Sequence, residues 1–168
     1  MSGIREAIEG ATEYLKDHPD EADYTDGPAT ARIESGLRTT VTGPGGESAV
    51  TDMVASVGGA GTAPSPGWLL RAAEASCVAT LIAMRAAQLG LVVDALEVVV
   101  DSISNDRGIL GIDASVPPGP RSTRVAVRIQ VDGASSGEVE GLVHWAVDHC
   151  PVTDAVRRAV PMTVEINR

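Results

Sequence analysis

The sequence predicts an α+β fold rather than one in which strands and helices alternate one by one. Stretches with strand character come first as a pair and later as a group of three, and a helix follows each group. The two long predicted helices each carry one of the two cysteines, Cys77 and Cys150, on an apolar stripe. With 168 residues and 43% hydrophobic side chains, the chain is long enough to bury a core.

The front of the chain predicts a short amphipathic helix and an acidic linker. Within residues 4–16, apolar side chains recur at helical spacing, namely Ile4, Ile8, Ala11 and Leu15. Residues 17–28 are polar and rich in turn-forming residues. Residues 1–27 contain eight acidic and two basic side chains, so they hold −6 of the formal net charge of −10. We therefore expect an N-terminal helix and linker over residues 1–27, separate from a domain over residues 28–168.

Strands are expected on both sides of the first long helix. Gly43-Pro44-Gly45-Gly46 predicts a hairpin turn between the first two strands, and the glycine-rich residues 58–64 predict a flexible connector. The clearest strand is 121–132, in which Val125, Val127 and Ile129 alternate with more polar residues. The full set of expected strands is 29–42, 49–57, 92–103, 109–116, 121–132 and 161–167.

The first long helix is expected to run from Pro66 to Leu89. Ser65 is a typical N-cap, proline is tolerated at the first helical position, and Gly90 is a typical C-terminal stop. The predicted core stripe of this helix contains Cys77 together with Leu70, Ala73, Leu81, Met84 and Gln88.

The second long helix is expected over residues 136–149. Its apolar face, which ends at Cys150, consists of Val139, Leu142, Val143, Ala146 and Val147. Pro151 then permits a fresh helical turn through Arg158, with Cys150 near its N-cap position.

Composition and charge exclude several classes of function. The net charge of −10 opposes binding to duplex DNA or to anionic membranes, and 2% aromatic residues leave few platforms for stacking single-stranded bases. No run approaches the roughly 18 consecutive apolar residues of a membrane span. The acidic N-terminal segment does not resemble a secretory signal. We expect a cytoplasmic protein that binds neither nucleic acid nor membranes.

The cysteines permit two interpretations, which the residues alone leave open. A buried cysteine often behaves as a small hydrophobic side chain. A pair of thiols on the core stripes of two helices fits a redox pair equally well. Cys150 has the support of a helix N-terminus, which favours thiolate. Cys77 would need a cation from elsewhere, for which Arg38 and Arg32 in the first strand region are candidates.

The other polar motifs give weaker evidence for a functional site. His144 and Asp148 share one helix face and His149 adjoins Cys150, but too few ligands accompany them for a metal site, and no local signature supports a Cys–His hydrolase. The glycine-rich residues 58–61 lack the GK[ST] that completes a phosphate-binding loop. We expect neither a metal nor an organic cofactor.

Two motifs resemble those of the OsmC/Ohr family of osmotically inducible and organic hydroperoxide resistance proteins. In residues 57–77, a glycine-rich loop and a Ser-Pro pair lead into an alanine-rich helix that carries Cys77. His149-Cys150-Pro151-Val152 is similar to the second cysteine motif of that family. The resemblance covers about residues 29–167. It implies an OsmC-like α+β fold, with antiparallel sheets and two cysteine-bearing helices, in an intertwined homodimer whose active sites lie at the subunit interface.

The resemblance also implies a thiol-dependent peroxidase that reduces organic hydroperoxides in oxidative stress defence. Cys77 would attack the hydroperoxide, and Cys150 would resolve the resulting sulfenic acid as a disulfide. Arg38, or less favourably Arg32, would stabilise the attacking thiolate. A cellular dithiol would then reduce the disulfide again.

One position departs from the family pattern. Gly67 stands where peroxidase members usually have a glutamate that orients the arginine. Glu47 and Glu74 are the candidates to replace it, although a carboxylate as close to Cys77 as Glu74 would raise the pKa of the thiol unless an arginine lay between them. The departure favours the alternative function, a non-catalytic member that binds a small apolar ligand at the dimer cleft.

Overall fold

The computed structural model describes residues 2–167, and their contacts divide the chain into two units. The first unit comprises Met1–Glu9 and Ala73–Arg168, and the second comprises Gly10–Ala72. The expected boundary after residue 27 stays a prediction. The helices and strands are α1 (Ser2–Asp17), β1 (Thr30–Ser35), β2 (Arg38–Thr42), β3 (Ser48–Thr51), α2 (Pro66–Leu89), β4 (Val93–Ile103), α3 (Asp106–Ile109), β5 (Ser122–Val131), α4 (Ser136–Asp148) and α5 (Pro151–Arg157).

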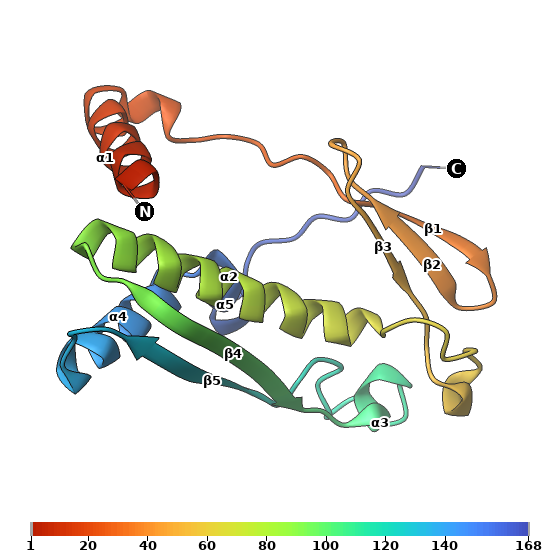
Figure 1. The fold of residues 1–168 in the computed structure, drawn as a ribbon. Coiled ribbons are helices and arrows are strands. Elements are labelled where there is room, and N and C mark those ends of the chain that lie inside the picture. Colours follow the sequence, from red (N-terminus) through yellow and green to blue (C-terminus); the bar gives the residue numbers. More distant parts are fainter. Residues whose placement is uncertain (1, 168) are drawn as a thin grey trace. The chain divides into compact units, whose positions relative to one another are not determined.

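The second unit contains a three-stranded antiparallel sheet in the order β1-β2-β3 (Figure 1). The predicted single strand over residues 29–42 is wrong: the chain reverses at Gly36, whose φ of 57° lies in the left-handed region that glycine adopts readily. The turn at residues 43–46 between β2 and β3 is confirmed. The strand expected to end at residue 57 stops at Thr51.

Strand β3 stops early because Asp52 organises the loop that follows it. Asp52 is 2% exposed, and its carboxylate accepts hydrogen bonds from the backbone N–H groups of Met53, Ala60 and Thr62 and from the Thr62 hydroxyl. The two Thr62 hydrogen bonds are the main reason that the pKa of Asp52 lies below its ordinary value. The segment predicted to be a flexible connector is therefore a loop built around a buried carboxylate.

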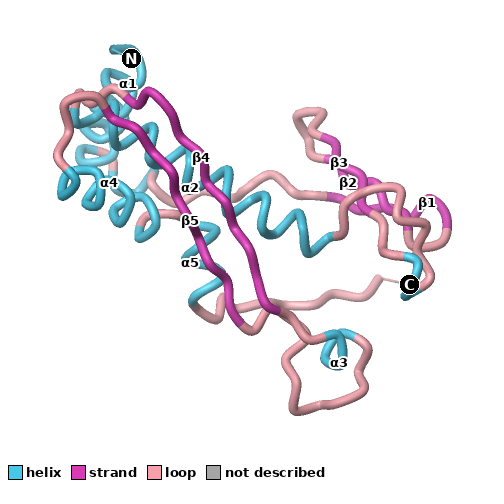
Figure 2. The backbone as a smooth tube through the Cα atoms, turned by 60° about the horizontal axis from the view of Figure 1, so that its bottom comes forward, coloured by secondary structure: helices cyan, strands magenta, loops and turns pink. Residues whose placement is uncertain are grey.

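The first unit is built on a long antiparallel hairpin of β4 and β5, in which Val98 pairs with Val127. Helices α2 and α4 lie against one face of this hairpin (Figures 1 and 2). The inward and outward alternation predicted for β5 is confirmed. The central buried cluster contains Val78, Ile82 and Ala86 of α2, Leu142 and Ala146 of α4, and Cys150.

Two predicted strands in this unit are wrong. Residues 109–116 form the end of α3 and a turn, because β4 pairs directly with β5. Residues 161–167 have no regular structure, and no strand among the described residues pairs with them. Their apolar residues alternate as in a strand but are exposed: Met162 by 84%, Val164 by 74% and Ile166 by 79%. A period-2 pattern produces a strand only where a partner supplies backbone hydrogen bonds.

The predicted bounds of α2 are confirmed, and α4 ends one residue before the predicted end at 149. Local caps explain where these helices begin and end. Ser65 Oγ accepts a hydrogen bond from the Trp68 N–H at the start of α2, and Gly90 ends this helix with a φ of 72°. Ser135 and Glu138 form a capping box at the start of α4.

The predicted core stripe of α2 is displaced by one residue. The buried positions are Glu74, Val78, Ile82, Ala86 and Ala87, whereas Cys77 is half-buried. Helix α2 is apolar on most of its sides, so the period of three and four residues does not select one face. The packing of α2 against α4 and the hairpin makes that selection.

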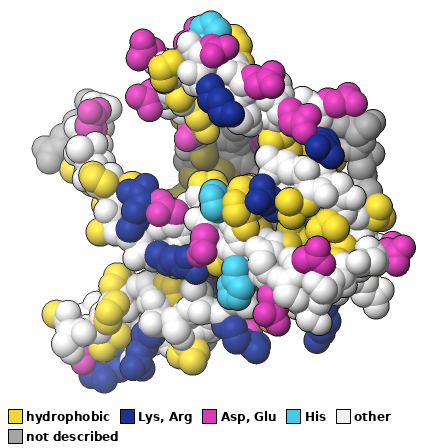
Figure 3. All heavy atoms as spheres, turned by 90° about the vertical axis from the view of Figure 1, so that its left-hand side faces the viewer, with side chains coloured by type: hydrophobic (Ala, Val, Ile, Leu, Met, Phe, Trp, Pro, Cys, Tyr) yellow, Lys and Arg dark blue, Asp and Glu magenta, His cyan; other side chains and the backbone are white. Residues whose placement is uncertain are grey.

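Length and composition alone would allow α2 to cross a membrane. Its contacts with α4 and the hairpin are those of a core helix in the first unit. Acidic side chains recur across the face of the protein drawn in Figure 3, with Lys and Arg between them, in keeping with the net charge of −10.

Candidate thiol site

The structure brings Cys77 and Cys150 together within the first unit. Cys77 lies on α2 and is half-buried, whereas Cys150 is fully buried at the N-cap of α5. Both are free thiols, and they lie near enough that each changes the pKa of the other. The two sulfurs are thus neighbours before any oxidation, although they are 73 positions apart in the sequence.

The two thiols differ in acidity. Burial raises the pKa of Cys77, and the neighbouring Cys150 thiol raises it further, against the opposing effect of the Val152 N–H. Burial also acts to raise the pKa of Cys150, but the opposing effects of the Thr153 side chain and N–H, together with those of Cys77 and the Val152 N–H, outweigh it. The pKa of Cys150 therefore lies below its ordinary value. Cys77 is the more accessible thiol, and Cys150 is the more acidic one.

Glu74 lies in the core next to this pair. It is 1% exposed, and the Thr153 hydroxyl donates to its Oε1 at 3.4 Å. Glu74 Oε2 is buried and has no hydrogen-bond partner among the described residues. Glu74 is not among the groups that raise the pKa of Cys77. Its carboxyl group is directed at Thr153 instead.

A pocket of about 340 Å³ reaches this buried carboxyl group. Strand β5 and helices α4 and α5 contribute most of its walls, and half of the lining residues are valines. Two basic side chains line it as well, the exposed His144 and Arg157, and Arg157 pairs with Asp148 at 3.1 Å. The pocket contains polar groups from Glu74, Thr123 and Thr153 among its apolar ones.

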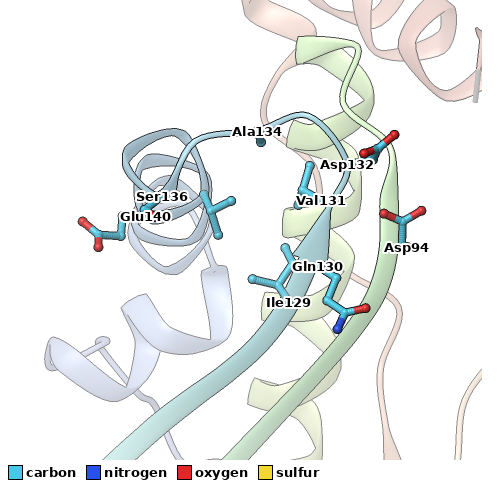
Figure 4. Close-up of a pocket in the computed structure, with 9 residues that line it drawn as sticks. Asp94, Ile129, Gln130, Val131, Asp132, Ala134, Ser136 and Glu140 are labelled. Atoms are coloured by element: carbon cyan, nitrogen blue, oxygen red, sulfur yellow. The ribbon is translucent and has the colours of Figure 1, made fainter.

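A larger hollow of about 490 Å³ lies where the open end of the hairpin meets the start of α4 (Figure 4). Figure 4 shows the carboxylates of Asp94 and Asp132 on one side of it and Glu140 on the other. No cysteine lines this hollow, so we do not assign it to the thiol site.

Arg38 belongs to the second unit, where its surroundings are well defined. Its Nε donates to Glu34 at 3.0 Å and its Nη1 donates to the Thr62 hydroxyl at 2.8 Å. The Thr62 hydroxyl in turn donates to Asp52 at 2.9 Å. A carboxylate and the Asp52 loop therefore fix the guanidinium of Arg38. Its expected place beside Cys77 stays a prediction.

Arg32, Glu47 and Gly67 were the other positions considered for the thiolate-stabilising arginine and its glutamate partner. Arg32 is exposed on β1, opposite Thr40. Glu47 is used within its own turn, where it accepts a hydrogen bond from the Gly45 N–H at 2.8 Å. Gly67 has room for a side chain, because a Cβ atom there would come no closer than 3.8 Å to its neighbours. Steric crowding thus does not explain the glycine.

The histidine next to Cys150 is engaged elsewhere. The His149 ring stacks on Trp145 with 4.1 Å between ring centroids, and its Nδ1 donates to the Trp145 carbonyl oxygen at 2.7 Å. This geometry gives no Cys–His pair. Within residues 2–167, no group of three or more His, Cys, Asp or Glu side chains is placed to hold a metal ion.

Sequence reasoning missed three residues that organise these sites: Thr153, Asp52 and Glu34. Thr153 was detectable in principle, because the third residue after an N-cap supplies an N–H to the capping side chain. Glu34 lies four residues before Arg38, but this spacing is informative only on a helix, and the pair here spans a strand turn. Asp52 has no local signal beyond the glycines that follow it.

The first unit thus has the architecture of a dithiol protein. One of its two neighbouring thiols lies on a long core helix, and the other lies at the N-cap of a short helix. The chain belongs to the family described as OsmC-like protein, whose sequence profile matches residues 59–165. A search of curated proteins found no match.

Solved structures with a similar fold come from several bacteria. An OsmC-like protein from Mycoplasma pneumoniae is 13% identical with a TM-score of 0.69, and the match covers 82% of this chain and 91% of that one. An organic hydroperoxide resistance protein OsmC from Legionella pneumophila is 23% identical, with a TM-score of 0.59 and coverages of 80% and 91%. The organic hydroperoxide resistance protein OhrB of Bacillus subtilis is 21% identical, with a TM-score of 0.52 and coverages of 80% and 93%.

Proposed function

We propose that this protein is a cytoplasmic thiol-dependent peroxidase that reduces organic hydroperoxides with Cys77 and Cys150. The observation that carries the proposal is that the two free thiols are neighbours in the core of the first unit, Cys150 in the buried cluster and Cys77 packed against it. Two thiols in contact can close a disulfide with little movement of the backbone. The names of the Legionella and Bacillus proteins support the choice of hydroperoxide as the substrate class.

Accessibility assigns the two roles. Cys77 is half-buried and Cys150 is 0% exposed, so a hydroperoxide reaches Cys77 first. The Cys77 thiolate attacks the peroxide oxygen, an alcohol leaves, and the sulfur becomes a sulfenic acid. Cys150 then attacks Cys77 Sγ, water is lost, and a disulfide forms. A cellular dithiol returns both sulfurs to thiols.

The surroundings of Cys77 within the first unit raise the pKa of its thiol. The attacking thiol therefore needs a nearby cation that lowers this pKa and stabilises the thiolate. Arg38 is the arginine that we propose for this role. Glu34 supplies the carboxylate that holds its guanidinium, which compensates for the glycine at position 67. Glu34, on the strand before Arg38, thus takes the place of the glutamate that usually orients the arginine in the family.

We also propose that the protein is a homodimer. The alternating exposed residues Met162, Val164 and Ile166 form an apolar strand pattern without a partner among the described residues. Such a segment is stabilised when it pairs with another strand. Light scattering at micromolar concentration should give about twice the mass of the 17.3 kDa chain. A mass near that of one chain would contradict the dimer.

The test of the function is oxidation of the reduced protein by cumene hydroperoxide. We expect one internal disulfide, identified by mass spectrometry of peptides as Cys77–Cys150. The rate of thiol loss should rise with pH as the Cys77 thiolate forms, since the thiol form is unreactive. Arg38→Ala should slow this reaction about tenfold or more at pH 7 and move its pH midpoint upward. Arg32→Ala, the matched control, should behave as wild type.

If both thiols stay free under excess hydroperoxide, the peroxidase function is wrong. The alternative is then a non-catalytic protein that binds a small apolar ligand, for which the glycine at position 67 remains the argument.

A further inference from the structure

In the second step of the proposed reaction, Cys150 attacks the oxidised Cys77 and must lose its own proton. Cys150 is fully buried, so water cannot take its proton directly when its sulfur attacks Cys77. Proton transfer needs an acceptor within hydrogen-bond reach, either directly or through one intermediate group. Such an acceptor must therefore lie beside Cys150.

Thr153 lies between Cys150 and Glu74. Its N–H donates to Cys150 Sγ at 3.4 Å, and its side chain is near enough to the same sulfur to lower the pKa of the Cys150 thiol. The hydroxyl oxygen also lies 3.4 Å from Glu74 Oε1. Because a hydroxyl can accept one proton while it donates another, it can pass a proton from the sulfur to the carboxylate.

Glu74 is an unusual residue to find at this position. Its neighbours on the buried stripe of α2, Val78 and Ile82, are apolar. A buried carboxyl group with one oxygen unpaired is costly, and native proteins rarely retain one without a reason. Transfer of protons to and from Cys150 is a reason that the geometry supplies.

The pocket connects this carboxyl group to the surface. Of the charged or titratable groups that line it with Glu74, His144 comes from α4 and Arg157 from α5, and both are exposed. Asp148 partly neutralises Arg157, with which it pairs. Thr153 also contacts Cys150, whose pKa Cys77 affects in turn. A proton held on Glu74 thus has a route to solvent.

We propose that Glu74 accepts the proton of Cys150 through the Thr153 hydroxyl as Cys150 attacks the oxidised Cys77. The S–H proton moves to the Thr153 oxygen while the hydroxyl proton moves to Glu74, and the new S–S bond forms. The hydroxide that leaves Cys77 takes up a proton from solvent, and Glu74 returns its own to solvent through the pocket. Glu74 acts through Thr153 and is a positioning residue. The inference rests on the proposed disulfide step.

Ellman's reagent, 5,5′-dithiobis(2-nitrobenzoate), isolates this step without any hydroperoxide. The accessible Cys77 forms a mixed disulfide and releases one nitrothiobenzoate. Cys150 then attacks Cys77 Sγ and displaces a second one, at a rate independent of reagent concentration. The two releases are followed by absorbance in stopped flow on the full-length protein.

Glu74→Gln keeps the shape of the side chain but removes the proton acceptor. We expect the second release to slow about 100-fold, while the first release keeps its wild-type rate. The slowed release should rise about tenfold per pH unit, because hydroxide must then remove the proton, whereas in wild type it stays level around neutral pH. Melting temperatures of all variants identify any that fail to fold.

Thr153 provides the second arm of the test. Thr153→Val removes the hydroxyl and should slow the second release as Glu74→Gln does, whereas Thr153→Ser restores the hydroxyl and should return the wild-type rate. Thr123→Val, which alters another hydroxyl that lines the same pocket, is the matched control and should have no effect. A purely structural role of Glu74 would not produce the change in pH profile.

Second releases within about twofold of wild type in both Glu74→Gln and Thr153→Val would overturn the relay. The outcome is separate from that of the peroxidase test. If the protein does not react with hydroperoxide but forms its disulfide by the relay, only the proposed peroxidase function is contradicted. If the Glu74→Gln variant reduces hydroperoxide at the wild-type rate, only the relay is contradicted.

Discussion

Cys77→Ser is expected to lose hydroperoxide turnover by about 1,000-fold or more, because a serine hydroxyl at this position has no base to activate it. His149 stacks on Trp145, and the Glu74 carboxyl group faces Thr153. Turnover is measured as consumption of cumene hydroperoxide in the presence of excess dithiothreitol. The melting temperature should stay close to that of wild type, since Ser and Cys have similar volumes and Cys77 is only half-buried.

Cys150→Ser is the matched control for this variant. It removes the other thiol and leaves the attacking one in place, so Cys77 should still react once with hydroperoxide. The sulfenic acid should then accumulate, react with dimedone and proceed to sulfinic acid under excess peroxide. Equal activity of the two variants would contradict the assignment of attacking and resolving roles.

Ile82→Ala is expected to lower the free energy of unfolding by about 2–5 kcal/mol. Ile82 is 0% exposed and lies at the centre of the cluster that α2 forms with α4 and the hairpin. Truncation removes its buried apolar surface and leaves a cavity that the surrounding side chains fill only in part. Equilibrium unfolding in urea measures the change, with wild type and variant at the same protein concentration.

Leu81→Ala is the control, because Leu81 belongs to the stripe that the sequence predicts to be buried. It is only partly buried in the structure, so its truncation should cost less than that of Ile82. If Leu81→Ala lowers the free energy of unfolding more than Ile82→Ala does, the buried face of α2 is the one that contains Leu81.

The sequence alone determined the features that depend on interactions between residues close together in the chain. The bounds of α2 follow from Ser65, Pro66 and Gly90, and the position of Cys150 at a helix N-cap follows from the proline after it. These groups satisfy or block backbone hydrogen bonds of their immediate neighbours, and distant parts of the chain hardly affect them. The α+β class and the family resemblance rest on such local features and on their spacing, and both are confirmed.

The tertiary structure alone decided features that depend on a partner. Residues 109–116 and 161–167 have strand patterns, but β4 pairs with β5 and leaves them without hydrogen-bonded neighbours. Helix α2 is apolar on most sides, so contacts with α4 and the hairpin determined that Glu74 rather than Cys77 occupies the most buried stripe. The contact of Glu74 with Thr153, 79 positions further along, likewise exists only after the helices pack. Burial and pairing are properties of two segments together, which is why no single segment of the sequence contained them.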